Sequence, residues 1–533
     1  MSSPQPEPTP QHWTALASGF PPLLKQRVAC LSPRSSSSSC ICPSKAFVLY
    51  LPSVALRSSQ SPSLAVATRL AADLQLPLVT VLNVTAPPAS EKRYLTPRRV
   101  AFLLEAAADA APSWGCCFVN VQNLTTDLSH PALVAQALSM CSRAAAVVVD
   151  EPFVDPHLAI VRRVEANSPV AVLRVDSSTV VPPRAVWGAA GAPKTYFKAW
   201  QWQEKSKHLR REHVQAAMRG DFDAVPVPST IDPAAALPAC LQRPGHRPLK
   251  AADLARVRGE EGGLKRLAGG LRGCAPDAPK PCAHTDGSGE AGLARWGEFL
   301  ARGGIGGYAG KRNDPRKVHG PSRMSCYTNV GAVSQFRIIH DVLKARGSEK
   351  FQDEILKWRE GAYAWCLAQP AHLDASKVVP GFAASWLRGR KGGATAQAEA
   401  AAELERLAAC RSPCETWNAM QRYLRDTGEL HNNVRMTWGK SAVGWLSRSC
   451  SPQEILDGLA HLNDYYALDG FSPPSYAGVT WCLGVGDKPA QGGGLSMKLS
   501  STYKCGAGEF GAAMRRRSID SFFAPKPKAL KNP

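Results

Sequence analysis

A series of short apolar runs that alternate with helix-like segments is the feature that most constrains the fold of this chain. The strand-like runs cover 46–51, 76–84, 116–121, 144–150 and 169–176. Alternation of this kind is typical of a parallel sheet, because each parallel strand needs a crossover long enough to return to the same edge. The pattern predicts a doubly wound parallel α/β domain over 46–190.

The segment after the first strand lacks a glycine-rich phosphate-binding motif. Leu51-Pro52-Ser53 stands where G-x-G-x-x-G would be expected in a dinucleotide-binding domain. A dinucleotide-dependent dehydrogenase is therefore disfavoured.

The second half of the chain has the hydrophobic spacing of helices from Gly289 onward, and glycines such as Gly347 and Gly428 stand where helices would end. This predicts an all-α domain over 289–505 that is large enough to enclose a cofactor. Segments rich in Pro, Gly, Ser or basic residues flank the two domains. They predict an interdomain connector along the surface and two disordered tails, at 191–288, 1–45 and 506–533.

The charge balance favours a polyanionic partner. The chain has 64 Lys and Arg against 43 Asp and Glu, a net charge of +21, and such an excess most often serves nucleic acid binding. No apolar run is long enough to cross a bilayer. The 16 cysteines follow no disulfide spacing, and Cys410 and Cys414 lack a second pair for zinc, so we expect buried thiols in a reducing compartment and no metal.

Two tryptophans, Trp438 and Trp445, lie two helical turns apart and therefore on one helix face. Such a pair usually belongs to a hydrophobic core. The sequence around them carries more information, because five segments resemble the FAD-binding domain of the DNA photolyase/cryptochrome family, in the family's order, and are most similar to class II cyclobutane pyrimidine dimer photolyases. The segments are GYAGKRNDP (307–315), SRMSCYTNVGAVS (322–334), KWREGAYAWC (357–366), CETWNAMQRYLRDTGELHNNVRMTWGKSAVGW (414–445) and LNDYYALDGFSPPSYAGVTWCLGVGDK (462–488).

The resemblance implies an antenna-type α/β domain followed by an all-α FAD-binding domain. The implied activity is light-driven repair of pyrimidine dimers in DNA, by electron transfer from photoexcited reduced FAD in a monomeric enzyme. A second, antenna chromophore is possible, and no motif identifies it. In the α/β half the likeness is limited to the pattern and to VDSSTVVPP at 175–183.

Three tryptophans match the family's electron-hopping chain to the flavin: Trp417 in W-N-x-x-Q, Trp438 in R-M-x-W, and Trp445. The resemblance implies that Trp417 lies nearest to the flavin. Asn463 matches the asparagine that faces the flavin N5, where an amide can donate or accept. Arg435 and Asp469 match an ion pair beside the flavin, which is also what a purely structural bridge would look like.

The implied FAD-phosphate loop contains Ser322, Ser325 and the backbone near Gly331, and Tyr308 and Asp464 complete the implied cofactor-binding residues. This loop departs from the family's usual L-S-P-W-F-H-F-G, because it reads M-S-C-Y-T-N-V-G here. The departure predicts altered flavin affinity or a different flavin state.

The implied substrate residues are Glu360, which would hydrogen-bond the flipped dimer, and Trp481, which would pack on it. Asn432 is a weaker candidate for the same side of the pocket. The alternative is a cryptochrome-like blue-light receptor, or a related DNA-binding protein without repair activity, which the altered loop and the divergent first domain favour. A 6-4 photoproduct enzyme would need a pair of pocket histidines that the sequence does not identify.

The C-terminal tail resembles a peptide that binds the sliding clamp of DNA replication. Ile519, Phe522 and Phe523 would form a hydrophobic plug on one helical turn, although Arg516 replaces the usual glutamine. With the basic flanks, this favours the nucleus. The absence of acidic residues between Glu7 and Asp73 keeps a chloroplast or mitochondrial transit peptide as the alternative.

Overall fold

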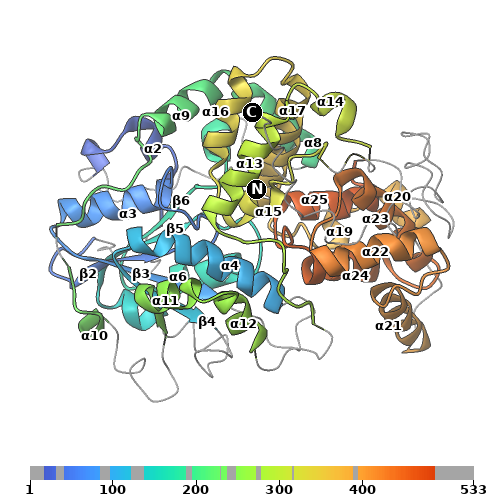
Figure 1. Cartoon of the computed structure of the whole chain (residues 1–533), viewed down its shortest axis with the longest axis horizontal. Coiled ribbons are helices and arrows are strands. Elements are labelled where there is room, and N and C mark those ends of the chain that lie inside the picture. The colour runs from blue at the N-terminus through green and yellow to red at the C-terminus, as the bar shows by residue number, and fades with distance from the viewer. Residues whose placement is uncertain are drawn as a thin grey trace, which may run out of the picture.

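The computed structural model describes residues 17–31, 41–84, 96–121, 137–187, 192, 195–228, 230–236, 248–271, 278–314, 317, 319–387 and 394–486. The α/β part lies on one side of the molecule and the C-terminal helices α19–α25 lie on the other (Figure 1). The fold class predicted from the sequence, a parallel α/β domain followed by a helical domain, is confirmed.

A seven-stranded sheet forms the centre of the described α/β part, in the order β1-β6-β5-β2-β3-β4-β7. Strands β2 to β6 are parallel to one another, whereas the edge strands β1 and β7 pair antiparallel with β6 and β4. The strand order reverses between β2 and β5, as in doubly wound sheets. The strands are β1 (Val28–Leu31), β2 (Phe47–Leu51), β3 (Leu78–Val84), β4 (Cys116–Val121), β5 (Ala144–Asp150), β6 (Val172–Val175) and β7 (Leu249–Lys250).

Both faces of this sheet are buried, which explains the uninterrupted apolar runs of the sequence. Along β2, Phe47, Leu49 and Leu51 belong to one hydrophobic cluster, whereas Val48 and Tyr50 belong to the cluster on the opposite face. Helix α3 (Pro62–Asp73) and helix α4 (Pro97–Ala110) contribute to the Val48 side, and α6 (His157–Asn167) contributes to the Phe47 side.

The N-terminal segment is more ordered than the sequence suggested. Residues 17–31 include η1 (Ala17–Gly19), helix α2 (Pro22–Lys25) and strand β1, which pairs with β6 through Val28 opposite Val175. The predicted tail over 1–45 is therefore wrong for these residues. A strand of four residues beside a Pro- and Ser-rich stretch gives too short a pattern to be recognised.

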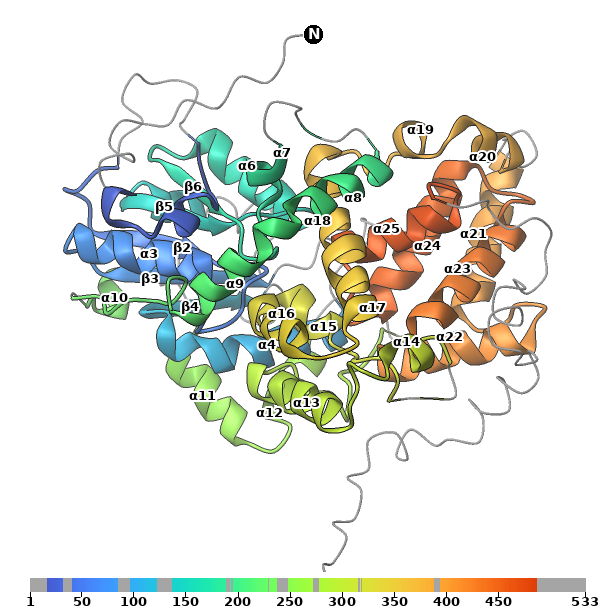
Figure 2. The ribbon, with the colours of Figure 1, turned by 90° about the horizontal axis from the view of Figure 1, so that it is seen from above.

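The predicted connector over 191–288 also contains regular elements. Helices α8 and α9 lie between the two halves of the molecule (Figure 2), and β7 completes the sheet edge. This stretch, with the residues just before it, forms α7 (Pro183–Trp187), α8 (Tyr196–Lys205), η4 (Ser206–His208), α9 (Arg210–Met218), α10 (Pro233–Ala236), α11 (Ala251–Gly259) and α12 (Gly263–Gly269).

The helical part has clear local signals for its helix ends. Helix α24 begins with a capping box in which Ser451 and Glu454 cap each other's backbone, and helix α22 ends at Gly428 with a φ of 71°. Its helices are α13 (Gly289–Ala301), α14 (Tyr308–Lys311), α15 (Ser325–Val330), α16 (Gln335–Lys344), α17 (Glu349–Gln352), the π-helical η6 (Asp353–Arg359), α18 (Glu360–Ala368), α19 (Ala375–Val378), α20 (Gly381–Trp386), α21 (Ala394–Ala408), α22 (Glu415–Thr427), α23 (Asn432–Leu446), α24 (Pro452–Tyr466) and α25 (Pro473–Cys482). None of the described helices is both long and apolar enough to span a membrane.

Buried arginines of α4 join the two parts. The Arg98 guanidinium donates to the carbonyl oxygens of Tyr466 (3.0 Å), Leu424 (3.3 Å) and Arg425, at the last turns of α24 and α22. The last carbonyls of a helix have no partner within the helix, so a cation is well suited to them. The Arg99 guanidinium donates to the Leu468 carbonyl just beyond α24.

Candidate functional site

A cavity of about 320 Å³ lies among the helices of the C-terminal part. Its volume falls in the range of small-ligand and cofactor sites, roughly 300 to 1,000 Å³. Met324, Met436 and Val479 give it apolar walls. The sequence-predicted residues that line it are Tyr308, Ser322, Ser325, Asn432, Arg435, Trp438, Asn463 and Asp469.

The predicted ion pair is present at this cavity. Arg435 of α23 places Nη2 2.9 Å from Oδ1 of Asp469, in the turn between α24 and α25. Its Nη1 lies 3.4 Å from Oδ1 of Asn463, on the last turn of α24. The two helices thus hold a cation, a carboxylate and an amide together at the wall.

Asp464 does not line the cavity. Its carboxylate is buried behind the wall and accepts hydrogen bonds from the Tyr476 hydroxyl (2.8 Å) and the Phe471 amide (2.8 Å). Because Asn463 and Asp464 are consecutive in α24, their side chains point about 100° apart. The structure therefore gives Asp464 the role of fixing the α24–α25 turn, in place of the predicted contact with a cofactor.

The three predicted tryptophans form a continuous cluster, in a different order from the one expected. Trp438 lines the cavity and stacks on Trp417, with ring centroids 6.1 Å apart and planes 6° apart. Trp445 meets Trp417 edge-on, with centroids 5.6 Å apart. Trp438, three residues after Arg435, shares the cavity-facing side of α23. The tryptophan at the cavity is therefore Trp438, whereas the resemblance implied Trp417.

Hydrogen bonds fix the orientation of two of these indoles. Nε1 of Trp417 donates to the Trp438 carbonyl oxygen (2.8 Å), and Nε1 of Trp438 donates to Oε1 of Gln421 (2.8 Å). All three rings are almost completely buried. The cluster is thus a buried column of aromatic rings that begins at the cavity wall.

The turn that holds Ser322 and Ser325 has a charged support that sequence reading missed. Arg323 lies between them with a φ of 58°, a left-handed conformation that is unfavourable for a residue other than glycine. Its guanidinium is bidentate to Glu429, with Nε to Oε2 and Nη2 to Oε1 both at 2.9 Å. Arg295 of α13 places Nη1 3.0 Å from the same Oε1. No spacing in the sequence connects three residues this far apart.

The charges of this cluster are strongly coupled. Burial alone would raise the pKa of Glu429, but Arg323 and Arg295 hold it at about 2. The carboxylate is therefore ionised at any physiological pH.

Gly331 is also placed away from the cavity. It ends α15 with a φ of 71°, and a Cβ there would collide with the backbone of Val54 and Ala55. Its carbonyl accepts a hydrogen bond from Nη1 of Arg57 (3.0 Å). The glycine predicted for the phosphate loop thus permits close packing of the helical part on the loop after β2.

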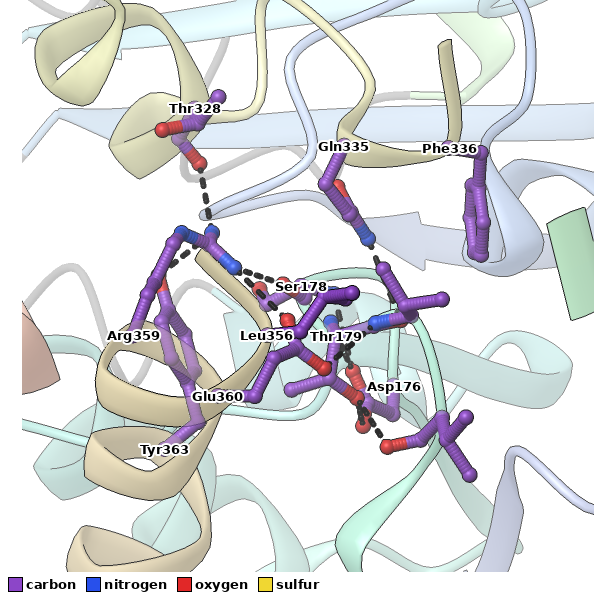
Figure 3. Close-up of polar contacts among 12 residues, drawn as sticks. Asp176, Ser178, Thr179, Thr328, Gln335, Phe336, Leu356, Arg359, Glu360 and Tyr363 are labelled. Carbon is purple, nitrogen blue, oxygen red and sulfur yellow. Dashed lines mark hydrogen bonds and ion pairs between the residues drawn. The ribbon is translucent and has the colours of Figure 1, made fainter. Parts of the chain in front are cut away.

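Glu360 is turned toward the α/β part (Figure 3). Its Oε2 accepts a hydrogen bond from the Val180 amide (2.8 Å), and its Oε1 pairs with Nη1 of Arg359 (3.1 Å). The side chain is 1% exposed and does not line the cavity. Burial raises its pKa to about 7. The predicted substrate contact of Glu360 is not present in this arrangement.

Arg359, which the sequence reading did not single out, does line the cavity. Its guanidinium donates to the carbonyl oxygens of Ser178 (3.0 Å) and Thr328 (3.4 Å) and to the Tyr363 hydroxyl (3.2 Å). Arg359 ends the π-helical segment η6, and π-helical turns are frequent at functional sites. It connects the cavity wall to the loop after β6.

Trp481 is partly buried and packs edge-on against Trp358 and Tyr196, with centroids 5.6 and 6.2 Å away. It is not among the residues of the cavity wall, whereas Asn432 is exposed at that wall. His431 lines the cavity and caps α23 through Nδ1, and burial lowers its pKa to about 4. His431 is therefore a neutral, packed histidine at physiological pH.

The clamp-like residues Ile519, Phe522 and Phe523 lie outside the described residues. The cysteines of the described part are free thiols, and no group of metal-binding side chains occurs there.

The cavity suits a flavin in the chemistry of its walls. Arg435, Asp469 and Asn463 offer donors and acceptors for a polar ring edge, and Trp438 and Met436 offer apolar contacts. Ser322, Ser325 and Arg323 provide hydroxyl and cationic groups for phosphates.

No family model matches the chain, whereas individual relatives do. A deoxyribodipyrimidine photo-lyase of Methanothermobacter thermautotrophicus is 25% identical over 449 residues, covering 83% of this chain and 87% of the relative. The photo-lyases of Oryza sativa and Arabidopsis thaliana are each 30% identical, over 184 and 187 residues, and the matches span 34% and 36% of those relatives.

Solved structures show the same fold. The Synechocystis cryptochrome superposes with a TM-score of 0.56 at 15% identity, covering 88% of each chain. A class III photolyase from Agrobacterium tumefaciens superposes with a TM-score of 0.52 at 15% identity, covering 91% of this chain and 88% of that one. The chain is thus similar in sequence to deoxyribodipyrimidine photo-lyases over most of its length, and it shares the two-part fold of photolyase and cryptochrome structures.

Proposed function

We propose that this protein is a light-driven, FAD-dependent enzyme that repairs cyclobutane pyrimidine dimers in DNA. The observation that carries the proposal is the aromatic column Trp438–Trp417–Trp445, which starts at the wall of a cavity that also holds Arg435, Asp469 and Asn463. Curated relatives named deoxyribodipyrimidine photo-lyases support the reaction class.

The cavity residues would have separate roles toward the flavin. Reduced FAD, when bound, would supply the light absorption and the electron that splits the dimer. Arg435 and Asn463 would orient the polar edge of the ring, and the tryptophan column would restore the reduced state by passing electrons inward. The apolar walls would exclude water from the site.

The test has two steps. The absorption spectrum of the purified protein should show bound flavin, and illumination with dimer-containing DNA should consume dimers, whereas a dark sample should not. A protein purified without any flavin, and unable to bind added flavin, would refute the cofactor proposal.

A flavin photoreceptor without repair activity is the second candidate, and one observation favours it. Glu360 is bound to Val180 and Arg359, and Trp481 is packed on Trp358 and Tyr196. Neither of these two predicted substrate residues lines the cavity, whereas the weaker candidate Asn432 does. Bound flavin that responds to light without any loss of dimers would select this candidate.

We further propose a nuclear location with sliding-clamp binding through Ile519, Phe522 and Phe523. The support is the sequence of the tail and its basic flank, Arg515 to Arg517. A pull-down with the clamp should lose the protein when both phenylalanines are changed to alanine, and unchanged capture would refute the proposal. Cell fractionation would distinguish the nucleus from a chloroplast or mitochondrion. Pigment extraction would show whether an antenna chromophore is bound.

A further inference from the structure

The charges in the described cavity wall are unevenly compensated. The wall residues that carry a formal charge are Arg323, Arg359, Glu429, Arg435 and Asp469. Arg435 is paired with Asp469, and Arg359 with Glu360, one charge against one. Glu429, in contrast, is shared by Arg323 of the wall and Arg295 from outside it.

Arg295 therefore gives this corner its excess charge. It projects from α13, and its Nη1 reaches both Oε1 of Glu429 (3.0 Å) and the carbonyl oxygen of Arg323 (3.2 Å). Its guanidinium lies 5.0 Å from the centre of the Tyr327 ring, so its position is fixed from several sides. Two guanidinium groups around one carboxylate leave one positive charge in excess.

The excess lies beside unused hydrogen-bond donors. Ser322 and Ser325 flank Arg323 on the same turn and also line the cavity. Neither hydroxyl forms a hydrogen bond with any other described residue, and Ser325 is exposed. A positive charge with two hydroxyl groups at one end of a cavity is suited to a phosphate group.

We propose that Arg295 determines cofactor specificity from outside the cavity, by creating a net positive corner at Ser322–Ser325 that prefers phosphorylated flavins to riboflavin. This inference rests on the proposed function for the identity of the ligand. The cluster Arg295–Arg323–Glu429 acts as a unit: Glu429 holds Arg323 in its left-handed turn, and Arg295 supplies the charge that remains. Arg295 is a positioning residue that acts on the ligand through its charge, since it does not itself line the cavity.

The test compares ligands that differ in charge. The apoprotein is titrated with FAD, flavin mononucleotide and riboflavin, followed by flavin fluorescence, in the wild type, Arg295→Gln and Arg295→Lys. We expect Arg295→Gln to weaken binding of both phosphorylated flavins by about tenfold, a loss of about 1.4 kcal/mol, and to leave riboflavin unchanged. Arg295→Lys should retain the preference because it keeps the charge, and added salt should reduce the difference.

Arg302→Gln is the matched control. Arg302 directly follows α13 and is also paired with a carboxylate, Glu298, but it is exposed. The Arg302→Gln variant should bind all three flavins with the affinity of the wild type. An equal loss for riboflavin and the phosphorylated flavins in Arg295→Gln would indicate a purely structural role and would overturn the inference, as would unchanged binding of all three.

Inorganic pyrophosphate, followed by calorimetry, separates this inference from the proposed function. If the wild type binds pyrophosphate in an Arg295-dependent way but binds no flavin, the flavin proposal fails and the anion-binding corner stands. If neither flavin nor pyrophosphate binds, both are refuted.

Discussion

The indole of Trp438 stacks on that of Trp417, with planes 6° apart, and Trp438 is the ring that reaches the cavity. We therefore expect Trp438→Phe and Trp417→Phe each to reduce flavin photoreduction to near the background rate, because each interrupts the aromatic column that runs from the cavity wall through Trp417 to Trp445. The measurement is the bleaching of oxidised flavin under blue light, without oxygen and with an external reductant.

Trp296→Phe is the control for this experiment. Trp296 is equally buried in the helical part, but it contacts Phe299 and Phe351 and donates to Asp341, away from the column. It should photoreduce at the wild-type rate. Normal photoreduction in Trp417→Phe would contradict the assigned path.

The Glu429 cluster predicts a specific loss of stability in acid. The pKa of Glu429 is about 2 in the folded chain against 4.5 for an ordinary glutamate, so its ionised form stabilises the fold above pH 4.5 and that contribution disappears as the pH falls toward 2. Glu429→Gln should reduce the free energy of unfolding by about 3 kcal/mol at pH 7. Urea unfolding at pH 7 and pH 3 should show the deficit shrinking by roughly half.

For Glu360 we predict the opposite dependence of stability on pH. Burial raises its pKa to about 7, above the 4.5 of the unfolded chain, so the fold binds a proton that the unfolded chain has released. The free energy of unfolding should fall between about pH 4.5 and pH 7. Glu360→Gln should remove this decline and be more stable than the wild type at pH 8, by about 1 to 3 kcal/mol.

Thermal unfolding at pH 5 and pH 8 checks this prediction. Glu405→Gln, at an exposed site on α21, serves as the control and should follow the wild type. If Glu360→Gln lost stability equally at both pH values, the fold would need the ionised carboxylate. The predicted gain of stability at pH 8 would then be wrong.

The hydrogen bonds of Arg98 predict a large contribution of this residue to the stability of the fold. Its side chain donates to carbonyl groups at the ends of both α22 and α24, and alanine would remove these buried hydrogen bonds. Arg98→Ala should lower the free energy of unfolding by about 2 to 4 kcal/mol. Arg163→Ala, at an exposed position on α6, should be almost neutral in the same urea titration.

The sequence predicts the sheet well because its strands are long apolar runs between helical segments. β1 escaped prediction because Val28–Leu31 is short and its register depends on β6, far along the chain. At the site, the predicted ion pair of Arg435 with Asp469 is present. Glu360 and Asp464 do not line the cavity, because a motif fixes the position of a residue in the chain, whereas the neighbouring loop decides which way its side chain turns. The Arg295–Glu429 contact depends on three distant elements, so no local pattern could reveal it.

The loop after β6 has a consequence for attempts to divide the chain. Its carbonyl groups at Ser177 and Ser178 accept hydrogen bonds from Gln335 and Arg359 of the helical part, and Arg57 of the α/β part donates to Gly331 in return. A fragment that begins at residue 289 would leave Arg359 and Glu360 without the Ser178 and Val180 groups that they bind. We expect such a fragment to be insoluble or only partly folded. The buried charges of each half form their hydrogen bonds with polar groups of the other half, and the fragment would lose those partners.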